Sequence, residues 1–204
     1  MATTQPHPLT SGKHSARRLA LVVLSLLAVA AVAVGWYKMS QPSTPNDVLN
    51  KPLYVPDDSS AARQAAAWRD SRPSDARLME RLARIPTAKW FGGDASFEDM
   101  RSYSAAAKTK GQVAVVVLYN IVHRDCGLYS AGGAQTAQSY GAFIDTFVRA
   151  IADNPTIVIV EPDSLAQLVG SKHSNCLTAE QATERLAMLR YAVTSLSDKP
   201  HVKV

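Results

Sequence analysis

Two short segments of the chain carry side chains that could do acid–base chemistry. In the first, Tyr119 is followed by Arg124-Asp125-Cys126-Gly127. In the second, an apolar run leads directly into Glu161-Pro162-Asp163. A single carboxylate in such a place is usually a helix cap or a salt-bridge partner. Two carboxylates that converge can divide the work, because one can protonate a leaving oxygen while the other raises its pKa by charge repulsion.

Both segments come after runs of residues that predict buried strands. Residues 113–119 (VAVVVLY) and 156–160 (TIVIV) are continuous apolar runs, which are typical of strands buried on both faces of a parallel sheet. The carboxyl ends of parallel strands meet at one edge of the sheet, and function collects there. We therefore expect Asp125 and Asp163 in one neighbourhood, with Tyr119 nearby.

The rest of the chain alternates between predicted strands and helices. Further strands are expected at 88–92 and from 201 onward, and helices are expected at 59–70, 75–84, 96–110, 137–153 and 178–196. Capping-box spacing marks two helix starts, at Ser96 with Asp99 and at Thr178 with Gln181. This order predicts an α/β fold with parallel strands. The last helix is expected to pack on the sheet through one apolar stripe, formed by Ala182, Leu186, Leu189, Val193 and Leu196.

The N-terminal segment has the pattern of an export signal. Residues 1–18 are a basic region, and the uncharged apolar run at residues 19–36 is expected to be a helix. This order is typical of a cleaved signal peptide or of a retained transmembrane anchor, and both interpretations stay open. The positive-inside rule places the chain after residue 37 outside the cell, either secreted or membrane-anchored. Residues 37–51 are expected to be a linker, and residues 52–204 one domain.

The composition excludes several classes of protein. The chain has 204 residues, of which 47% are hydrophobic and 19% charged, so it is neither collagen-like nor mostly disordered. The net charge is +5, but three cations (Lys13, Arg17 and Arg18) lie in the basic N-terminal region. The small remaining excess does not predict a nucleic-acid partner. Two cysteines allow one disulfide in an exported protein.

The two segments resemble the signatures of glycoside hydrolase family 6, which contains inverting β-1,4-glucanases and cellobiohydrolases. The first signature is a Tyr, then Arg-Asp-Cys-Gly and a small-residue loop, matched by Tyr119, residues 124–127 and Gly132-Gly133. The second is Glu-Pro-Asp-Ser/Ala-Leu after an apolar strand, matched by residues 161–165. Lesser matches extend the resemblance over roughly residues 50–204, and it implies a distorted β/α barrel with parallel strands.

The resemblance also implies catalytic roles for three residues and a substrate-binding role for a fourth. Asp163 is expected to be the general acid that protonates the glycosidic oxygen. Asp125 is expected to keep that acid protonated and to help order the catalytic water. Tyr119 is expected to lie close to the reacting sugar ring and to favour its distortion. Ser130, in the small-residue loop, is expected to contact the sugar or the water.

Substrate binding and a disulfide are implied in the same way. Trp90 is expected to stack on a glucose unit, and Gly92 to leave room for the sugar. Cys126 and Cys176 are expected to form a disulfide that ties two active-site loops together. No cofactor and no metal are expected. The expected partner is a β-glucan polysaccharide or oligosaccharide, with membrane contact through residues 19–36 if the signal is not cleaved.

The resemblance has two departures. The family usually has Pro and Gly before Arg-Asp-Cys, whereas this chain has Val122 and His123, so we expect a less rigid loop. Family domains also continue past the position of Val204, so we expect a partial barrel, truncated at its C-terminus, with the general-acid half of the site. The predicted function is inverting hydrolysis of β-1,4-glucosidic bonds in cellulose-like polysaccharide, of the endoglucanase type. The alternative is an inactive exported remnant or a glucan-binding module.

Overall fold

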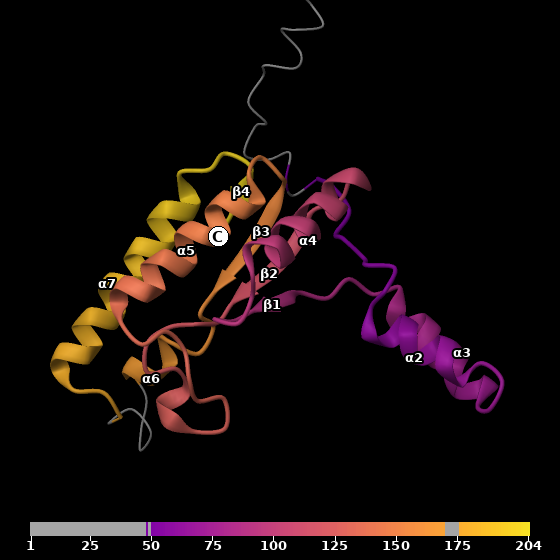
Figure 1. Cartoon of the computed structure of the whole chain (residues 1–204), viewed down its shortest axis with the longest axis horizontal. Coiled ribbons are helices and arrows are strands. Elements are labelled where there is room, and N and C mark those ends of the chain that lie inside the picture. Colours follow the sequence, from indigo (N-terminus) through magenta and orange to yellow (C-terminus); the bar gives the residue numbers. More distant parts are fainter. Residues whose placement is uncertain (1–47, 49, 170–175) are drawn as a thin grey trace, which may run out of the picture. The chain divides into compact units, whose positions relative to one another are not determined.

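The computed structural model of the chain describes Val48, residues 50–169 and residues 176–204 (Figure 1). The basic region at 1–18 and the apolar helix expected at 19–36 lie outside the described residues, as does most of the linker expected at 37–51. No helix in the described ranges is long and apolar enough to cross a membrane.

Four parallel strands form one sheet in the order in which they occur in the chain (Figure 1). They are β1 (Lys89–Phe91), β2 (Ala114–Leu118), β3 (Thr156–Val160) and β4 (Val202–Lys203). The last residues of the first three strands are in register, since Phe91 pairs with Leu118 and Leu118 with Val160. The predicted α/β fold with parallel strands is confirmed, and the sequential strand order is that of a partial β/α barrel.

A helix follows each of the first three strands and returns the chain to the start of the next. These helices are α4 (Phe97–Thr109), α5 (Ala137–Ile151) and α7 (Ala179–Ser197), with the short α6 (Ala166–Val169) between β3 and α7. Two more helices, α2 (Ser60–Trp68) and α3 (Pro73–Ala83), precede β1 and pack against each other. All of the helices predicted within the described residues are therefore found, within a few residues at each end.

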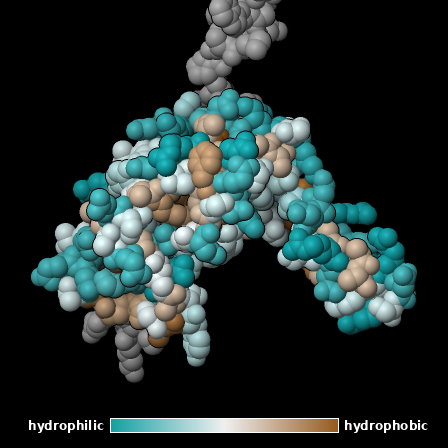
Figure 2. All heavy atoms as spheres, in the orientation of Figure 1, coloured by the Kyte–Doolittle hydropathy of each residue, from teal (hydrophilic) through white to brown (hydrophobic). Residues whose placement is uncertain are grey.

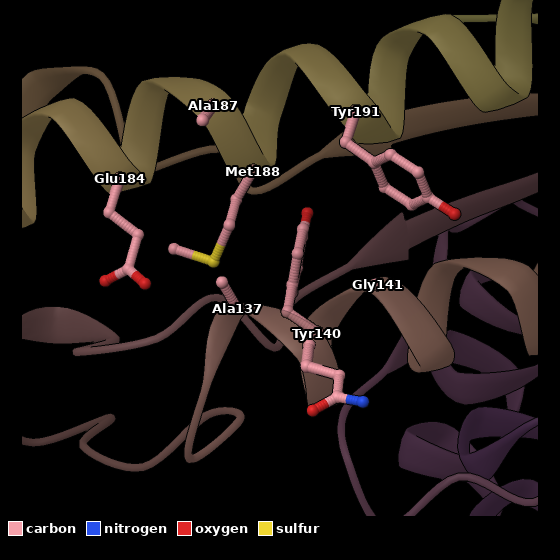
Figure 3. Close-up of a pocket in the computed structure, with 8 residues that line it drawn as sticks. Ala137, Tyr140, Gly141, Glu184, Ala187, Met188 and Tyr191 are labelled. Atoms are coloured by element: carbon pink, nitrogen blue, oxygen red, sulfur yellow. The ribbon is translucent and has the colours of Figure 1, made fainter.

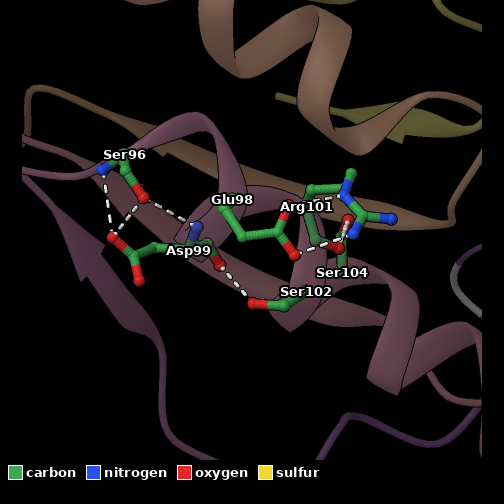
Figure 4. Close-up of polar contacts among 6 residues, drawn as sticks. All are labelled: Ser96, Glu98, Asp99, Arg101, Ser102 and Ser104. Carbon is green, nitrogen blue, oxygen red and sulfur yellow. Dashed lines mark hydrogen bonds and ion pairs between the residues drawn. The ribbon is translucent and has the colours of Figure 1, made fainter.

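Helix α4 begins with the predicted capping box, and Figure 4 shows its hydrogen bonds. Ser96 Oγ accepts a hydrogen bond from the Asp99 backbone N–H at 3.1 Å, and Asp99 Oδ2 accepts one from the Ser96 backbone N–H at 3.0 Å. Thr178 and Gln181 make the equivalent pair at the start of α7. Both capping boxes satisfy backbone donors that the first helical turn leaves without partners.

Helices α4, α5 and α7 all cover the same face of the sheet. One buried cluster joins Met100 of α4, Phe147 of α5 and Met188 of α7 to Leu118 and Val158 of the strands. Side chains alternate along a strand, so the residues between these positions lie on the opposite face. That second face carries Trp90, Val117 and Ile159, which lie side by side because their strands pair in register.

The second face of the sheet corrects one prediction. The run 156–160 was expected to be buried on both faces, yet Ile159 is 42% exposed. The reason is that helices cover only one face of β3 in the described part of the chain. In Figure 2 hydrophobic residues also lie scattered among hydrophilic ones on the face that is seen there.

Helix α7 corrects a second prediction, because it packs through a different stripe from the one expected. Of the predicted residues, Leu186 and Val193 are exposed and Leu196 is buried. The buried face instead consists of Arg185, Met188, Ala192 and Leu196. Figure 3 shows Met188 of α7 and Tyr140 of α5 in the space between the two helices, where they line a pocket of about 320 Å³. A charged residue, Arg185, therefore occupies a position that the apolar pattern assigned to the solvent side.

Candidate active site

Tyr119 and Asp163 meet at the carboxyl ends of β2 and β3, as the sequence predicts. Tyr119 follows the last residue of β2, and its hydroxyl donates a hydrogen bond to Asp163 Oδ2 at 2.9 Å. Burial raises the pKa of the Tyr119 hydroxyl, and its bond to Asp163 raises that pKa further. The phenol therefore stays protonated at neutral pH and remains the donor in this contact.

Trp90 of β1 completes an aromatic edge beside this pair. Its ring lies edge-on to that of Tyr119, with ring centroids 5.3 Å apart, and more than half of the Trp90 side chain is exposed. Gly92 follows the end of β1, and a Cβ added there would lie 3.1 Å from Asp94 Oδ1. Trp90 and Gly92 both line an open cavity of about 840 Å³. The aromatic face that was expected to bind sugar is thus accessible to a ligand.

Asp125 lies in a tight turn of the loop after β2. Its backbone has φ of 53°, in the left-handed region, and its Oδ2 accepts a hydrogen bond from the Ser130 backbone N–H at 2.6 Å. The Ser130 side chain interacts with the Tyr119 hydroxyl and lowers the pKa of that group slightly against the effect of burial. Ser130 therefore connects Asp125 to Tyr119, which brings the three expected catalytic residues and Ser130 to one end of the sheet.

Arg124 organises the same loop, although the sequence reasoning gave it no role. Its guanidinium donates to three backbone carbonyls, those of Tyr119 at 2.8 Å, Ser130 at 2.7 Å and Ala131 at 3.1 Å. The guanidinium carbon also lies 4.8 Å from the centre of the Tyr119 ring. A rigid fork of five N–H donors makes this arrangement possible, and lysine could not reproduce it.

The loop after β2 depends on left-handed backbone conformations. His123 has φ of 55°, at the position where the family usually has Gly. Gly133 has φ of 89°, and a Cβ added there would lie 2.0 Å from the Ile121 carbonyl oxygen. Glycine is therefore required at Gly133 both by conformation and by space.

Replacing Gly133 by alanine is expected to lower the free energy of unfolding by roughly 2–3 kcal/mol, from backbone strain and overpacking. The matched control is Gly111→Ala, because Gly111 has φ of 67° but no atom within 4 Å of the added Cβ. The control should cost roughly 1 kcal/mol, from the left-handed conformation alone. Urea unfolding of the two variants measures both effects, and an equal loss in each would contradict the steric argument.

Glu161 is the carboxyl group that the sequence reasoning did not assign to the site. Its side chain is buried, and Oε1 accepts a hydrogen bond from the Asn120 backbone N–H at 2.8 Å. Burial raises the pKa of Glu161 to about 7, although backbone donors and the Tyr140 hydroxyl act to lower it. A Glu between an apolar strand and Pro162 gave no signal of burial, because charged residues are rarely buried.

We expect the raised pKa of Glu161 to make stability depend on pH. An unfolded Glu ionises near pH 4.5, whereas folded Glu161 keeps its proton up to about pH 7. The stability from this proton is therefore complete below pH 4.5 and is lost as the pH rises through 7, by about 3 kcal/mol in all. Glu161→Gln, which mimics the protonated form, should match the wild type at pH 5 and be more stable at pH 8.5. If Glu161→Gln and the wild type had equal free energies of unfolding at pH 8.5 as well as at pH 5, this prediction would be contradicted.

Arg185 of α7 forms hydrogen bonds with both loops of the site. Its guanidinium is buried and donates to the carbonyls of Val122 at 3.2 Å and His123 at 2.8 Å, in the loop after β2. It also donates to the Ser164 carbonyl at 3.4 Å and to Gln167 Oε1 at 2.5 Å, after β3. Arg185 therefore links the loop of Asp125 to the turn of Asp163.

The expected disulfide between Cys126 and Cys176 is present, with Cα atoms 5.6 Å apart. Cys126 lies next to Asp125 in the loop after β2, and Cys176 lies just before α7. The bond therefore fixes the loop after β2 to the segment that leads into α7, close to the place where Arg185 makes its contacts.

Comparison with known proteins places these features in a family. A family model described as glycosyl hydrolases family 6 matches residues 48–204. Endoglucanase 1 of Streptomyces halstedii is 34% identical over 186 residues, which cover 88% of this chain and 54% of the relative. Endoglucanase A of Cellulomonas fimi is 36% identical over 137 residues, which cover 65% of this chain and 28% of the relative.

A solved structure gives a similar result. An endoglucanase of Mycobacterium tuberculosis, in complex with methyl-cellobiosyl-4-deoxy-4-thio-β-D-cellobioside, has a TM-score of 0.66 and 33% identity to this chain. The match covers 77% of this chain and 52% of that one, so the chain spans about half the length of this relative. Since the family model covers the strands, the helices and both site loops of the described domain, the chain belongs to glycosyl hydrolases family 6.

Proposed function

We propose that this chain forms the general-acid side of an inverting β-1,4-glucanase of the endoglucanase type. The observation that carries the proposal is the hydrogen bond from Tyr119 to Asp163, beside the exposed Trp90 ring. Asp163 protonates the glycosidic oxygen of the bond that is cleaved. Because the Tyr119 hydroxyl holds Oδ2, the other oxygen, Oδ1, carries the proton toward the substrate.

Asp125 supports this acid in the proposed mechanism. Its carboxylate is oriented by the Ser130 N–H and helps to order the attacking water. An inverting enzyme also needs a base on the other side of the bond, about 6.5–9.5 Å from the acid. The proposal assigns the acid side alone.

We propose a β-1,4-linked glucan as the substrate. The endoglucanase of M. tuberculosis binds a thio-linked cello-oligosaccharide, which supports a substrate built of glucose units for this chain as well. The exposed ring of Trp90 offers the flat apolar surface on which the C–H face of a glucose unit stacks. Gly92 lines the same open cavity and leaves space next to that surface.

We propose that the enzyme acts outside the cell. The basic region at 1–18 and the apolar run at 19–36 support export, with or without cleavage of the signal. The disulfide between Cys126 and Cys176 also supports an oxidising compartment, because such bonds are rare in the cytosol.

The test uses the full chain with cellohexaose and carboxymethylcellulose. Binding is measured by calorimetry and hydrolysis by the release of reducing ends. Where the chain hydrolyses these glucans, we expect Asp163→Asn to lower the hydrolysis rate about 10²–10⁴-fold and to leave oligosaccharide binding nearly unchanged. Trp90→Ala should weaken binding. The matched control is Asp70→Asn, a change of the same kind at an exposed residue between α2 and α3.

Each outcome decides between the two candidate functions. Hydrolysis that depends on Asp163 supports the glucanase. Binding that depends on Trp90, without hydrolysis, supports the glucan-binding module instead. Hydrolysis that is as fast in Asp163→Asn as in Asp70→Asn would contradict the role of Asp163. A protein that neither binds nor cleaves either glucan would overturn both proposals.

A further inference from the structure

Glu161 ends the pairing between β2 and β3 in an irregular way. Its backbone N–H donates to the Leu118 carbonyl at 2.9 Å, as a parallel ladder requires. The next bond of a regular ladder would run from the Asn120 N–H to the Glu161 backbone carbonyl. The Asn120 N–H instead donates to Oε1 of the Glu161 side chain, at 2.8 Å.

The backbone conformation of Glu161 explains this exchange. Its φ of 45° is in the left-handed region, which turns the Glu161 carbonyl out of the ladder. That carbonyl accepts hydrogen bonds from the Ser164 N–H at 3.0 Å and from Ser164 Oγ at 2.6 Å. The two bonds close a tight turn, and Asp163 lies inside this turn.

We propose that Glu161 is a positioning residue for Asp163. The side-chain carboxyl of Glu161 replaces the Glu161 backbone carbonyl in the ladder, and this fixes the turn that contains Asp163 against the end of β2. The chain of contacts is short. Glu161 holds the N–H of Asn120, and Asn120 directly follows Tyr119, whose hydroxyl binds Asp163. The ladder is a feature of the fold itself, and its consequence for catalysis rests on the proposed function.

The protonation state of Glu161 sets the strength of this link. A hydrogen bond from an N–H to a carboxylate is shorter and stronger than one to a neutral carboxyl group. Three titratable or charged groups face Glu161: Tyr140 on α5, Arg185 on α7 and Arg124 in the loop after β2. Glu161 Oε2 and Tyr140 Oη are both buried, and neither makes a hydrogen bond of regular geometry. The two groups are close enough for each to change the pKa of the other.

The first experiment reads the link directly in the protein without ligand. The Asn120 amide is followed by ¹⁵N–¹H correlation spectroscopy between pH 4 and 9. In parallel, the fluorescence of Trp90, which touches Tyr119, is recorded in a Trp36→Phe/Trp68→Phe protein. We expect both signals to change with a common midpoint near pH 7, where Glu161 ionises. A midpoint near 4.5, or two unrelated midpoints, would overturn the proposal.

Variants assign this transition to Glu161. Glu161→Gln keeps an oxygen acceptor for Asn120 and is expected to remove the transition from both signals. Glu184→Gln removes the same charge from an exposed position on α7 and is expected to leave the transition in place. Both variants keep His123 and His201, so a transition caused by a histidine would persist in Glu161→Gln and would overturn the assignment.

The second experiment tests the catalytic consequence. Glu161→Leu removes the acceptor and is expected to lower kcat for cellohexaose about 10- to 100-fold with little change in KM, whereas Glu161→Gln should retain most of kcat. Equal kcat losses in Leu and Gln would overturn the positioning role. If the wild type neither binds nor cleaves cellohexaose, the proposed function fails, and the spectroscopic result alone decides whether Glu161 positions Asp163.

Discussion

Replacing Arg185 by methionine is expected to lower the free energy of unfolding by about 3–5 kcal/mol. Methionine fills the space of the aliphatic stem but donates no hydrogen bond. The carbonyls of Val122, His123 and Ser164 would each lose a donor, and the burial of Val122 and Ser164 keeps water from replacing that donor easily at those two residues. Because these carbonyls lie in both site loops, the loops of Asp125 and Asp163 should loosen together.

The matched control for this change is Arg190→Met. Arg190 lies on the same helix, α7, but is exposed, so its replacement should change the free energy of unfolding by less than about 0.5 kcal/mol. Arg185→Lys should lie between the two, because lysine keeps the charge and loses the fork of donors. The measurement is urea unfolding followed by circular dichroism. Equal losses in Arg185→Met and Arg190→Met would show that the buried contacts contribute nothing.

The sequence predicts the parts of the site that depend on strand ends. Two apolar runs predict β2 and β3, and parallel strands bring their carboxyl ends to one edge. This reasoning predicts that Asp125 and Asp163 share one neighbourhood with Tyr119 nearby, and in the structure Tyr119 donates a hydrogen bond to Asp163. The capping boxes at Ser96 and Thr178 could also be predicted from the sequence, because a capping box involves only four consecutive residues.

The parts that could not be predicted depend on contacts between distant residues. Arg185 is buried because four acceptors from two loops converge on it, and its neighbours on α7 carry no sign of them. The expected stripe therefore assigned exposed residues such as Leu186 to the core. Glu161 is similar, because its inward position results from a left-handed backbone angle that the sequence pattern does not reveal.

The prediction that β3 is buried on both faces was wrong for a further reason. A continuous apolar run predicts that both faces of a strand are covered, but it does not say what covers them. Here the helices pack on one face, and Ile159 on the other face stays partly exposed beside Val117. The same face also carries Trp90, which is exposed, whereas Val117 between the two is buried, so this face of the sheet leads from apolar strand residues to the aromatic edge of the site.

Reducing the disulfide between Cys126 and Cys176 is expected to lower the free energy of unfolding by about 4 kcal/mol, since the bond closes a loop of 50 residues in the unfolded chain. Unfolding in urea is compared with and without dithiothreitol. The control is the Cys126→Ser/Cys176→Ser protein, which should be as unstable as the reduced wild type and should not respond to reductant. Because the loop of Asp125 would lose its covalent link, glucan hydrolysis should also fall. If reduction leaves both stability and hydrolysis unchanged, Arg185 and Arg124 suffice to hold that loop, and the bond is dispensable for the site.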